Sequence, residues 1–320
     1  MDNFTHSLAG WALGQAGLKT TTRKGLAALI LGANMPDIDV FFGSVPWEPL
    51  AMHRGFTHSL VGGIVVMPSL LFGLLLMLDR WQVARGASFR SGLAMHPWRL
   101  LGLCYLGALT HPLLDLQTTY AVQLLSPFSG AWFHSDSLFI IDVWLWSLLS
   151  LAIAWSRGEE KAGREWRRVP MLAVAAMLAY IAFNLGLSQT ARERVLAASP
   201  AAGDVFASPD PVLSWRREMV WREGDCYRRA RFTISGSLGP LSACAPSGMD
   251  HPWVVRARAD LPELRRFLGW SVLPQAYVER GRCGGRVKVS DARYGDRRDS
   301  RLSFEWFVGC EQIPAKARPD

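Results

Sequence analysis

The chain has 320 residues and a formal net charge of +8; half of its residues are apolar and only 19% are charged. Soluble domains carry about 25% charged residues, so this chain is poor in charge, and its mean hydropathy is +0.11. This composition excludes a disordered protein, a collagen and a small disulfide scaffold, because half of the chain requires burial. The length fits about two domains, or one membrane unit and one further domain.

Long apolar segments dominate residues 1–189. Two short helical segments come first, at about Phe4–Leu18 and Gly25–Met35. Four runs of 17 or more residues follow: Ser59–Leu78, Leu100–Leu116, Leu138–Trp155 and Val169–Gln189. A single run of this kind can be the core helix of a soluble protein, but about 20 apolar residues also cross a bilayer. Four runs favour a multi-pass α-helical membrane domain of about six helices, with the first two short.

The basic residues between these segments predict an orientation. With alternating helices, three loops fall on one side and hold 12 Lys or Arg: Lys19, Arg23, Lys24, Arg80, Arg85, Arg90, Arg99, Arg157, Lys161, Arg164, Arg167 and Arg168. The opposite loops hold only Arg54. Because short basic loops stay in the cytoplasm, we expect a bacterial inner-membrane protein whose N-terminus and whose residues after 190 face the periplasm.

The C-terminal part has a different composition. We expect a linker at 190–211, rich in Ala, Ser and Pro from Ala197 to Pro211, and a soluble β-rich (α+β) domain at 212–320. Its β-type runs are Met219–Trp221, Tyr227–Ser235, Trp253–Arg258, Val287–Val289 and Leu302–Val308. The four cysteines of this part, Cys226, Cys244, Cys283 and Cys310, predict two disulfides with three pairings open, and four inert thiols are the alternative.

Histidines and aspartates gather on the outer side of the predicted membrane domain. Their motifs are Asp37-Ile-Asp39 after a proline, His53 and His58 around a glycine, His111 and Asp115 one helical turn apart, and His6 in the first helix. Each motif alone is explained by turn chemistry, capping or a buried hydrogen bond. Together they favour a metal centre, and nitrogen and carboxylate ligands without thiolates fit zinc, manganese or iron.

The same motifs resemble a known family. Asp2-x-x-Thr-His6, Pro36-Asp37-x-Asp39, His53-Arg54-Gly-x-Thr57-His58-Ser59 and His111-x-x-x-Asp115 are similar to motifs of the YdjM-like inner-membrane proteins, described as metal-dependent hydrolases. The resemblance covers roughly residues 1–185. It implies a multi-pass membrane hydrolase whose metal is held by these His and Asp side chains, with no defined substrate.

The candidate ligands are seven: His6, Asp37, Asp39, His53, His58, His111 and Asp115. A catalytic zinc needs about three protein ligands, so the number fits one or two ions, with zinc the first choice and Asp39 or Asp115 as a bridge between two. We expect Asp39 and Arg54 to take part in catalysis, Arg54 by holding an anionic substrate group. A salt bridge from Arg54 to a site carboxylate is the alternative. Supporting side chains are expected from His134, Asp136, Asp142, Thr57, Ser59 and Thr110.

The predicted position of the site suggests its substrate. A metal-activated water at the outer membrane–water boundary fits hydrolysis of an ester or phosphoester in a lipid or lipid-linked molecule. The expected partners are membrane lipids and no nucleic acid, since the basic C-terminal domain is predicted to face away from the cytoplasm. A non-enzymatic membrane protein, an assembly factor or regulator with a structural metal site, is the alternative.

Overall fold

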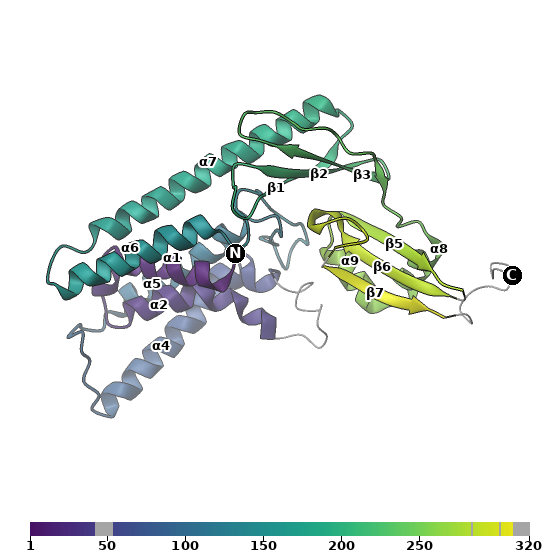
Figure 1. Cartoon of the computed structure of the whole chain (residues 1–320). Coiled ribbons are helices and arrows are strands. Elements are labelled where there is room, and N and C mark those ends of the chain that lie inside the picture. Colours follow the sequence, from purple (N-terminus) through teal and green to yellow (C-terminus); the bar gives the residue numbers. More distant parts are fainter. Residues whose placement is uncertain (42–53, 283, 301, 310–320) are drawn as a thin grey trace. The chain divides into compact units, whose positions relative to one another are not determined.

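The computed structural model describes residues 1–41, 54–282, 284–300 and 302–309 (Figure 1). The chain divides into two compact units. The first, the helical unit, holds most of the chain up to Gln189 together with Ser208–Arg216. The second holds Thr190–Ala207 and the chain from Arg217 onward.

Six α-helices start within the described residues of the helical unit: α1 (Asn3–Gln15), α2 (Gly25–Asn34), α4 (Met67–Ala84), α5 (Pro97–Asp115), α6 (Val143–Lys161) and α7 (Arg168–Ala198). Local chemistry fixes several starts. The carboxylates of Asp2 and Asp142 accept backbone N–H groups at the first turns of α1 and α6, and proline occupies the first turn of α4 and α5. Three short helical turns complete the unit: the 3-10 turns η2 (Met35–Phe41) and η3 (Phe56–His58), and the π-helix η4 (Gly62–Val66).

Two helices in the described residues are long and apolar enough to cross a membrane, Gly62–Ala84 and Arg168–Ala198. The prediction of a six-helix multi-pass domain is therefore wrong, although a helix lies close to each predicted segment. The other helices do not meet the requirement for different reasons. Helices α1 and α2 have only 13 and 10 residues. The last turns of α6 carry Arg157, Glu159, Glu160 and Lys161, and α5 includes Arg99, His111 and Asp115.

Glycines let α1, α2 and α5 pack closely. A Cβ atom on Gly10 of α1 or on Gly107 of α5 would lie 2.6 Å from the carbonyl oxygen of Leu29 in α2. The backbone of α2 is therefore held between its two neighbours at a separation that no larger side chain permits. This packing aligns the ends of the three helices, and the polar side chains described below lie at those ends.

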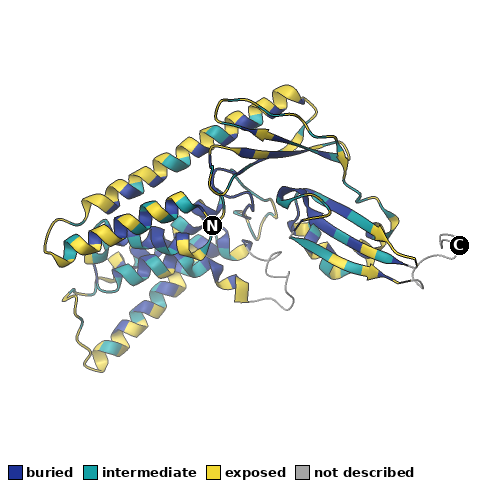
Figure 2. Ribbon diagram, in the orientation of Figure 1, coloured by how far each residue is buried: buried dark blue, intermediate teal, exposed yellow. Residues whose placement is uncertain are grey.

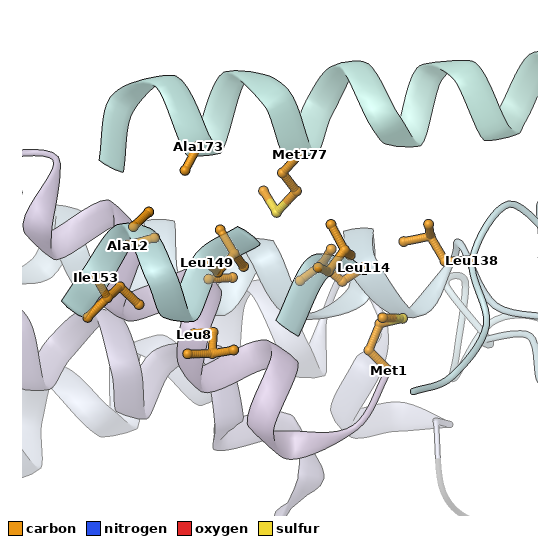
Figure 3. Close-up of a cluster of buried hydrophobic side chains, with 12 residues drawn as sticks. Met1, Leu8, Ala12, Leu114, Leu138, Leu149, Ile153, Ala173 and Met177 are labelled. Carbon is orange, nitrogen blue, oxygen red and sulfur yellow. The ribbon is translucent and has the colours of Figure 1, made fainter. Parts of the chain in front are cut away.

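Apolar side chains from α1, α5, α6 and α7 fill a core beside this contact (Figure 3). Leu8, Leu145 and Leu149 are buried there, and Ala173 and Met177 of α7 cover them. Many outward-facing side chains of α4 and α7 are exposed and apolar instead, among them Met77 and Leu172 (Figure 2). Burial thus separates α5, which is largely covered by protein, from the two candidate spans.

The second unit contains two antiparallel sheets. One has the strand order β1 (Gly203–Pro209), β2 (Arg217–Glu223), β3 (Cys226–Phe232) and β4 (Ala245–Pro246), and the other has β5 (Pro274–Arg280), β6 (Gly285–Asp291) and β7 (Ser303–Val308). Helices α8 (Pro252–Asp260) and α9 (Pro262–Trp270) join the sheets. Strand β1 lies inside the segment predicted as a linker.

One of the predicted β-type runs is helical. Trp253–Arg258 belongs to α8, because His251 Nδ1 accepts the backbone N–H of Trp253 and Pro252 occupies the first turn. These capping residues outweigh the β propensity of Trp and Val. The neighbouring runs at β2, β3, β6 and β7 are strands.

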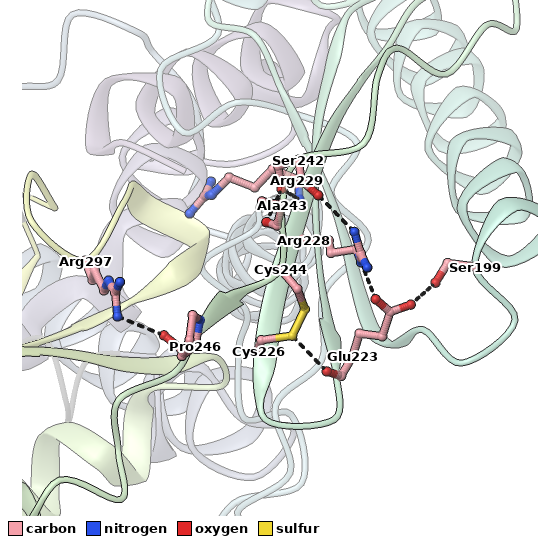
Figure 4. The surroundings of a disulfide bond; sticks show 10 residues. All are labelled: Ser199, Glu223, Cys226, Arg228, Arg229, Ser242, Ala243, Cys244, Pro246 and Arg297. Carbon is pink, nitrogen blue, oxygen red and sulfur yellow. Dashed lines mark hydrogen bonds and ion pairs between the residues drawn. A yellow bond between two sulfur atoms is a disulfide. The ribbon is translucent and has the colours of Figure 1, made fainter.

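A disulfide joins Cys226 and Cys244 across the first sheet (Figure 4). It realises one of the pairings that the sequence left open. Cys283 and Cys310 lie outside the described residues. Cys104, in α5, is a buried thiol, and burial raises its pKa to about 12.

The close contact at Gly107 yields a stability test with a control in the same helix. Gly107→Ala places a methyl group against the Leu29 carbonyl, and overpacking of this kind costs about 1–3 kcal/mol. Gly102 is exposed and an added Cβ there meets nothing within 4 Å, so Gly102→Ala gains only helix propensity. We expect a lower Tm for Gly107→Ala and an equal or higher Tm for Gly102→Ala. An equal rise in both would contradict the packing described here.

Candidate metal centre

Four side chains meet at one end of the helical unit. Asp37, His58, His111 and Asp115 each place a ligand atom within 4.8 Å of the others, and all four are buried. They come from η2, from η3 and from the last two turns of α5. We call them the four-residue group.

Short backbone elements aim these side chains at one another. Helix α2 ends at Asn34, and the 3-10 turn after it carries Asp37. His111 and Asp115 are four residues apart in α5, so they lie on the same helix face. A Cβ atom on Gly62 would lie 1.9 Å from the carbonyl oxygen of Phe56, so η4 packs directly on the turn that carries His58. The position of His58 thus depends on a glycine.

Hydrogen bonds fix which nitrogen of His111 carries the proton. Its Nδ1 lies 2.6 Å from the carbonyl oxygen of Ala33. A carbonyl only accepts, so Nδ1 is the donor, and Nε2 of the neutral ring presents a lone pair.

The same reasoning applies to His58. Thr57 Oγ1 donates its hydrogen to Asp39 Oδ2 over 2.6 Å. His58 Nδ1 lies 3.0 Å from Thr57 Oγ1 and 3.3 Å from Asp39 Oδ2, so both neighbours accept and Nδ1 donates. The Nε2 lone pair of His58 then faces the group, 3.0 Å from Nε2 of His111. Metal-ligating histidines are held by such a partner on the second nitrogen.

Two carboxylates complete the convergence. Asp37 Oδ1 lies 3.2 Å from His58 Nε2 and 3.3 Å from His111 Nε2. Asp115 Oδ2 lies 3.3 Å from both nitrogens and has no hydrogen-bond partner within the described residues. With both rings neutral, four buried acceptor atoms face one another, and only a cation between them relieves their repulsion.

A proton and a metal ion are the two cations that fit this place. Burial opposes a charge on His111, but the carboxylates of Asp115 and Asp37 outweigh it and raise its pKa to about 9. Positive charge is therefore stabilised between the four atoms. Two imidazole nitrogens and two carboxylate oxygens are also a donor set of zinc, manganese and iron sites.

Asp39 lies behind His58 and outside the four-residue group. Its Oδ2 accepts from Thr57 Oγ1 and from the backbone N–H of Arg54, the latter over 3.3 Å. The structure therefore gives Asp39 and Thr57 one shared contact, the Nδ1 side of the His58 ring.

Arg54 is 1% exposed, and its φ of 65° lies in the left-handed region, rare for a residue other than glycine. Its Nη2 lies 3.0 Å from Asp115 Oδ1, and its Nη1 donates to Thr118 Oγ1 over 2.7 Å. The guanidinium also lies over the Tyr120 ring, 4.7 Å from the centroid. This geometry favours the salt bridge that the sequence left open as the alternative to substrate binding.

His6 stands beside the four-residue group. Its ring stacks on that of His111 with centroids 3.8 Å apart, and its Nε2 lies 3.4 Å from Asp115 Oδ1. Neither ring nitrogen has a hydrogen-bond partner in the part of the chain that is described. Burial lowers the pKa of His6 to about 3, so the ring is neutral. The amino group of Met1 also contacts Asp115 Oδ1.

The remaining predicted residues have other contacts, and His53 lies outside the described residues. His134 Nδ1 lies 2.9 Å from Asp136 Oδ1, and Asp142 caps α6 and accepts from Tyr180. The hydroxyl of Ser59 donates to Phe56 O, and that of Thr110 donates to Gly107 O, one turn back in α5.

Three contacts of the site were not anticipated from the sequence: the Ala33 carbonyl, Thr118 and Tyr120. A backbone carbonyl has no residue-specific signature, so its role at His111 could not be read from any motif. Thr118 and Tyr120 follow Asp115 by three and five residues in the turn after α5, and this proximity to a candidate ligand was the available indication.

The fold and the site define a helical, membrane-associated type of protein with a buried His/Asp group able to hold a metal ion. A family model described as YdjM inner membrane protein matches residues 1–191. The chain therefore belongs to the YdjM inner membrane protein family, in agreement with the resemblance of its motifs. No curated protein and no solved structure matches the chain.

Substitutions can separate direct ligands from the residue behind them. We expect His58→Ala and His111→Ala to abolish binding of Zn²⁺ to the purified protein, because each removes a nitrogen from the four-residue group. Asp39→Asn leaves those atoms in place and weakens the hold on His58, so we expect an affinity about 10–100-fold lower. Competition with a metal-sensitive dye measures both effects.

The matched control is His96→Ala, at an exposed histidine that precedes α5. It should bind Zn²⁺ as the wild type does. Unchanged affinity in His58→Ala or His111→Ala would rule out the four-residue group as the binding site.

Proposed function

We propose that this protein is a metal-dependent hydrolase of the inner membrane, and that Asp37, His58, His111 and Asp115 hold one divalent transition-metal ion. One observation carries the proposal. The two Nε2 lone pairs and the two carboxylates converge in a buried place, and each imidazole is held in the required tautomer by an acceptor on its other nitrogen. Zinc is our first choice, with manganese or iron as alternatives of similar ligand chemistry.

The chain's own residues prepare the site for catalysis. Asp39 and Thr57 orient His58, and the Ala33 carbonyl orients His111. Arg54 balances the charge of Asp115 through their 3.0 Å contact. A metal held there supplies a water of lowered pKa and polarises an ester or phosphoester oxygen.

Exposed apolar side chains on the ligand-bearing segments support a lipid or lipid-linked substrate. Ile38 adjoins Asp37, Phe56 is two residues from His58, and Leu113 lies between His111 and Asp115. These three side chains are 36%, 43% and 51% exposed. A substrate with an acyl or isoprenoid chain gains apolar contact at such a rim while its polar ester approaches the four-residue group.

The alternative is a non-enzymatic membrane protein with a structural metal site. One observation favours it: four protein ligands complete a tetrahedral zinc shell, whereas catalytic zinc sites keep a position open for water. Turnover distinguishes the two functions.

A hydrolysis screen tests the proposal. We expect the purified wild-type protein to hold about one zinc, manganese or iron ion per chain by elemental analysis, and to release product from an ester or phosphoester lipid. His58→Ala should lose both the ion and the activity, and His96→Ala should keep both. Bound metal with no turnover on any lipid class, and full biological activity of metal-free His58→Ala, would establish the structural alternative. Absence of any bound transition metal would contradict both functions.

We further propose that the four-residue group and the C-terminal unit face the periplasm. The asymmetry of Lys and Arg supports this orientation, as does the Cys226–Cys244 disulfide, because such bonds persist in oxidising compartments.

Thiol trapping in living cells tests this orientation. Thiols are blocked with iodoacetamide before lysis, and the peptides are mapped without reductant. We expect Cys226 and Cys244 to be linked in normal cells and alkylated in cells that lack the periplasmic disulfide-forming oxidase. Buried Cys104 should stay unmodified until the protein is denatured. Alkylated Cys226 and Cys244 in normal cells would place the C-terminal unit in the cytoplasm.

A further inference from the structure

The ends of the helices remote from the four-residue group form a second surface of the helical unit, which we call the basic end. It consists of the α1–α2 turn, the α4–α5 loop and the α6–α7 loop. In α5, Arg99 lies in the first turn, whereas Asp115 is the last residue of the 19-residue helix. At 1.5 Å per residue, the two ends of α5 are about 27 Å apart.

Contacts between distant parts of the sequence bring the three loops together. The backbone N–H of Arg23 donates to Ala94 O over 3.0 Å, and Arg99 Nη1 donates to Thr21 O over 3.1 Å. On the other side, Lys19 Nζ lies 2.5 Å from Glu160 Oε2. The α1–α2 turn therefore joins the other two loops into one surface.

This surface carries a large excess of positive charge. The three loops, with the adjoining helix ends, hold 12 Lys or Arg and four acids, so their net charge of +8 equals that of the whole chain. The four acids are all paired: Asp79 with Arg23, Glu160 with Lys19, Glu159 with Arg164 and Glu165 with Arg168. Seven exposed basic side chains have no carboxylate partner within the described residues: Arg80, Arg85, Arg90, Arg99, Arg157, Lys161 and Arg167.

Exposed tryptophans stand among these charges. Trp81, Trp98 and Trp155 are 54%, 84% and 63% exposed, and the Arg85 guanidinium lies 4.6 Å from the ring centroid of Trp81. Tryptophan next to Lys and Arg is typical of the boundary between the hydrocarbon core and the headgroups of a bilayer, where the indole ring is partly buried in lipid.

Apolar helix surface continues from this belt. In α4, Leu74 and Met77 are exposed just before Arg80, and in α7, Met171 and Leu172 are exposed just after Arg168. Both helices are the candidate membrane spans. A surface for nucleic acid has no need of such apolar staves, whereas a lipid bilayer provides acyl chains beside them and phosphates beside the arginines.

From these observations we propose that the basic end binds anionic phospholipid headgroups of the bilayer. The unpaired arginines contact headgroup phosphates, and Trp81, Trp98 and Trp155 lie at the level of the headgroups. Binding is electrostatic, so it weakens as ionic strength rises. The proposal concerns a surface separate from the four-residue group and does not depend on any catalytic activity.

Lipid binding by the full-length protein in a neutral detergent tests the proposal. We expect phosphatidylglycerol to bind more tightly than phosphatidylcholine in titrations followed by native mass spectrometry, and to raise the Tm more. The triple variant Arg80→Gln, Arg85→Gln, Arg99→Gln should lose this preference, with an affinity for phosphatidylglycerol at least tenfold lower, since each removed charge contributes about fivefold. Its Tm without lipid should stay unchanged, because none of the three side chains has a carboxylate partner in the described residues.

The control is a triple variant of equal charge in the second unit, Arg222→Gln, Arg256→Gln, Arg286→Gln, all at exposed positions. It should keep the wild-type preference. Equal affinity for the two lipids, or equal loss in both triple variants, would overturn the proposal. So would tighter binding of duplex DNA or RNA than of phosphatidylglycerol, lost in the first variant. Suppression of lipid binding by millimolar inorganic phosphate at constant ionic strength would indicate a site for free phosphate instead.

Discussion

The contact between the Nε2 atoms of His58 and His111 constrains this structure more than any other. Two lone pairs 3.0 Å apart, with two carboxylate oxygens beside them, repel one another in a place without solvent. Such an arrangement is stable only with a cation in its centre and with a rigid frame around it. The close packing of α1, α2 and α5 at Gly10 and Gly107 supplies that frame, because it fixes the helix ends from which the ligands project.

A second layer of charge surrounds the four atoms. Arg54 links its two halves: its guanidinium contacts Asp115, and its backbone N–H donates to Asp39, the carboxylate behind His58. The left-handed backbone at Arg54 is an unfavourable conformation that the surrounding contacts maintain. Arg54 therefore acts on the orientation of other side chains, and its burial separates it from a substrate. A basic residue near candidate ligands predicts charge balance as readily as it predicts anion binding.

The sequence predicted the ligands better than the membrane topology. His111 and Asp115 share a helix face at any depth of burial, so their spacing was sufficient. For Asp37 and Asp39 it was insufficient, because a one-residue difference within a 3-10 turn directs the first carboxylate to the ions' place and the second to the Nδ1 side of His58. The span count failed at α5, whose apolar residues are buried against α1, α2 and α4. Hydropathy alone does not say whether protein or lipid covers an apolar side chain.

The same packing explains why the two ends of the helical unit have opposite chemistry. Each of α1, α2 and α5 runs between the basic end and the four-residue group, and α2 and α5 have few charged side chains in between. Carboxylates needed to attract a cation and arginines needed to attract phosphate would neutralise one another if they were adjacent. A separation of about 27 Å exceeds the Debye length at physiological salt severalfold, so the two surfaces retain independent fields. Short, glycine-packed helices thus do more than hold a core together: they keep the anionic and cationic surfaces of one small unit apart.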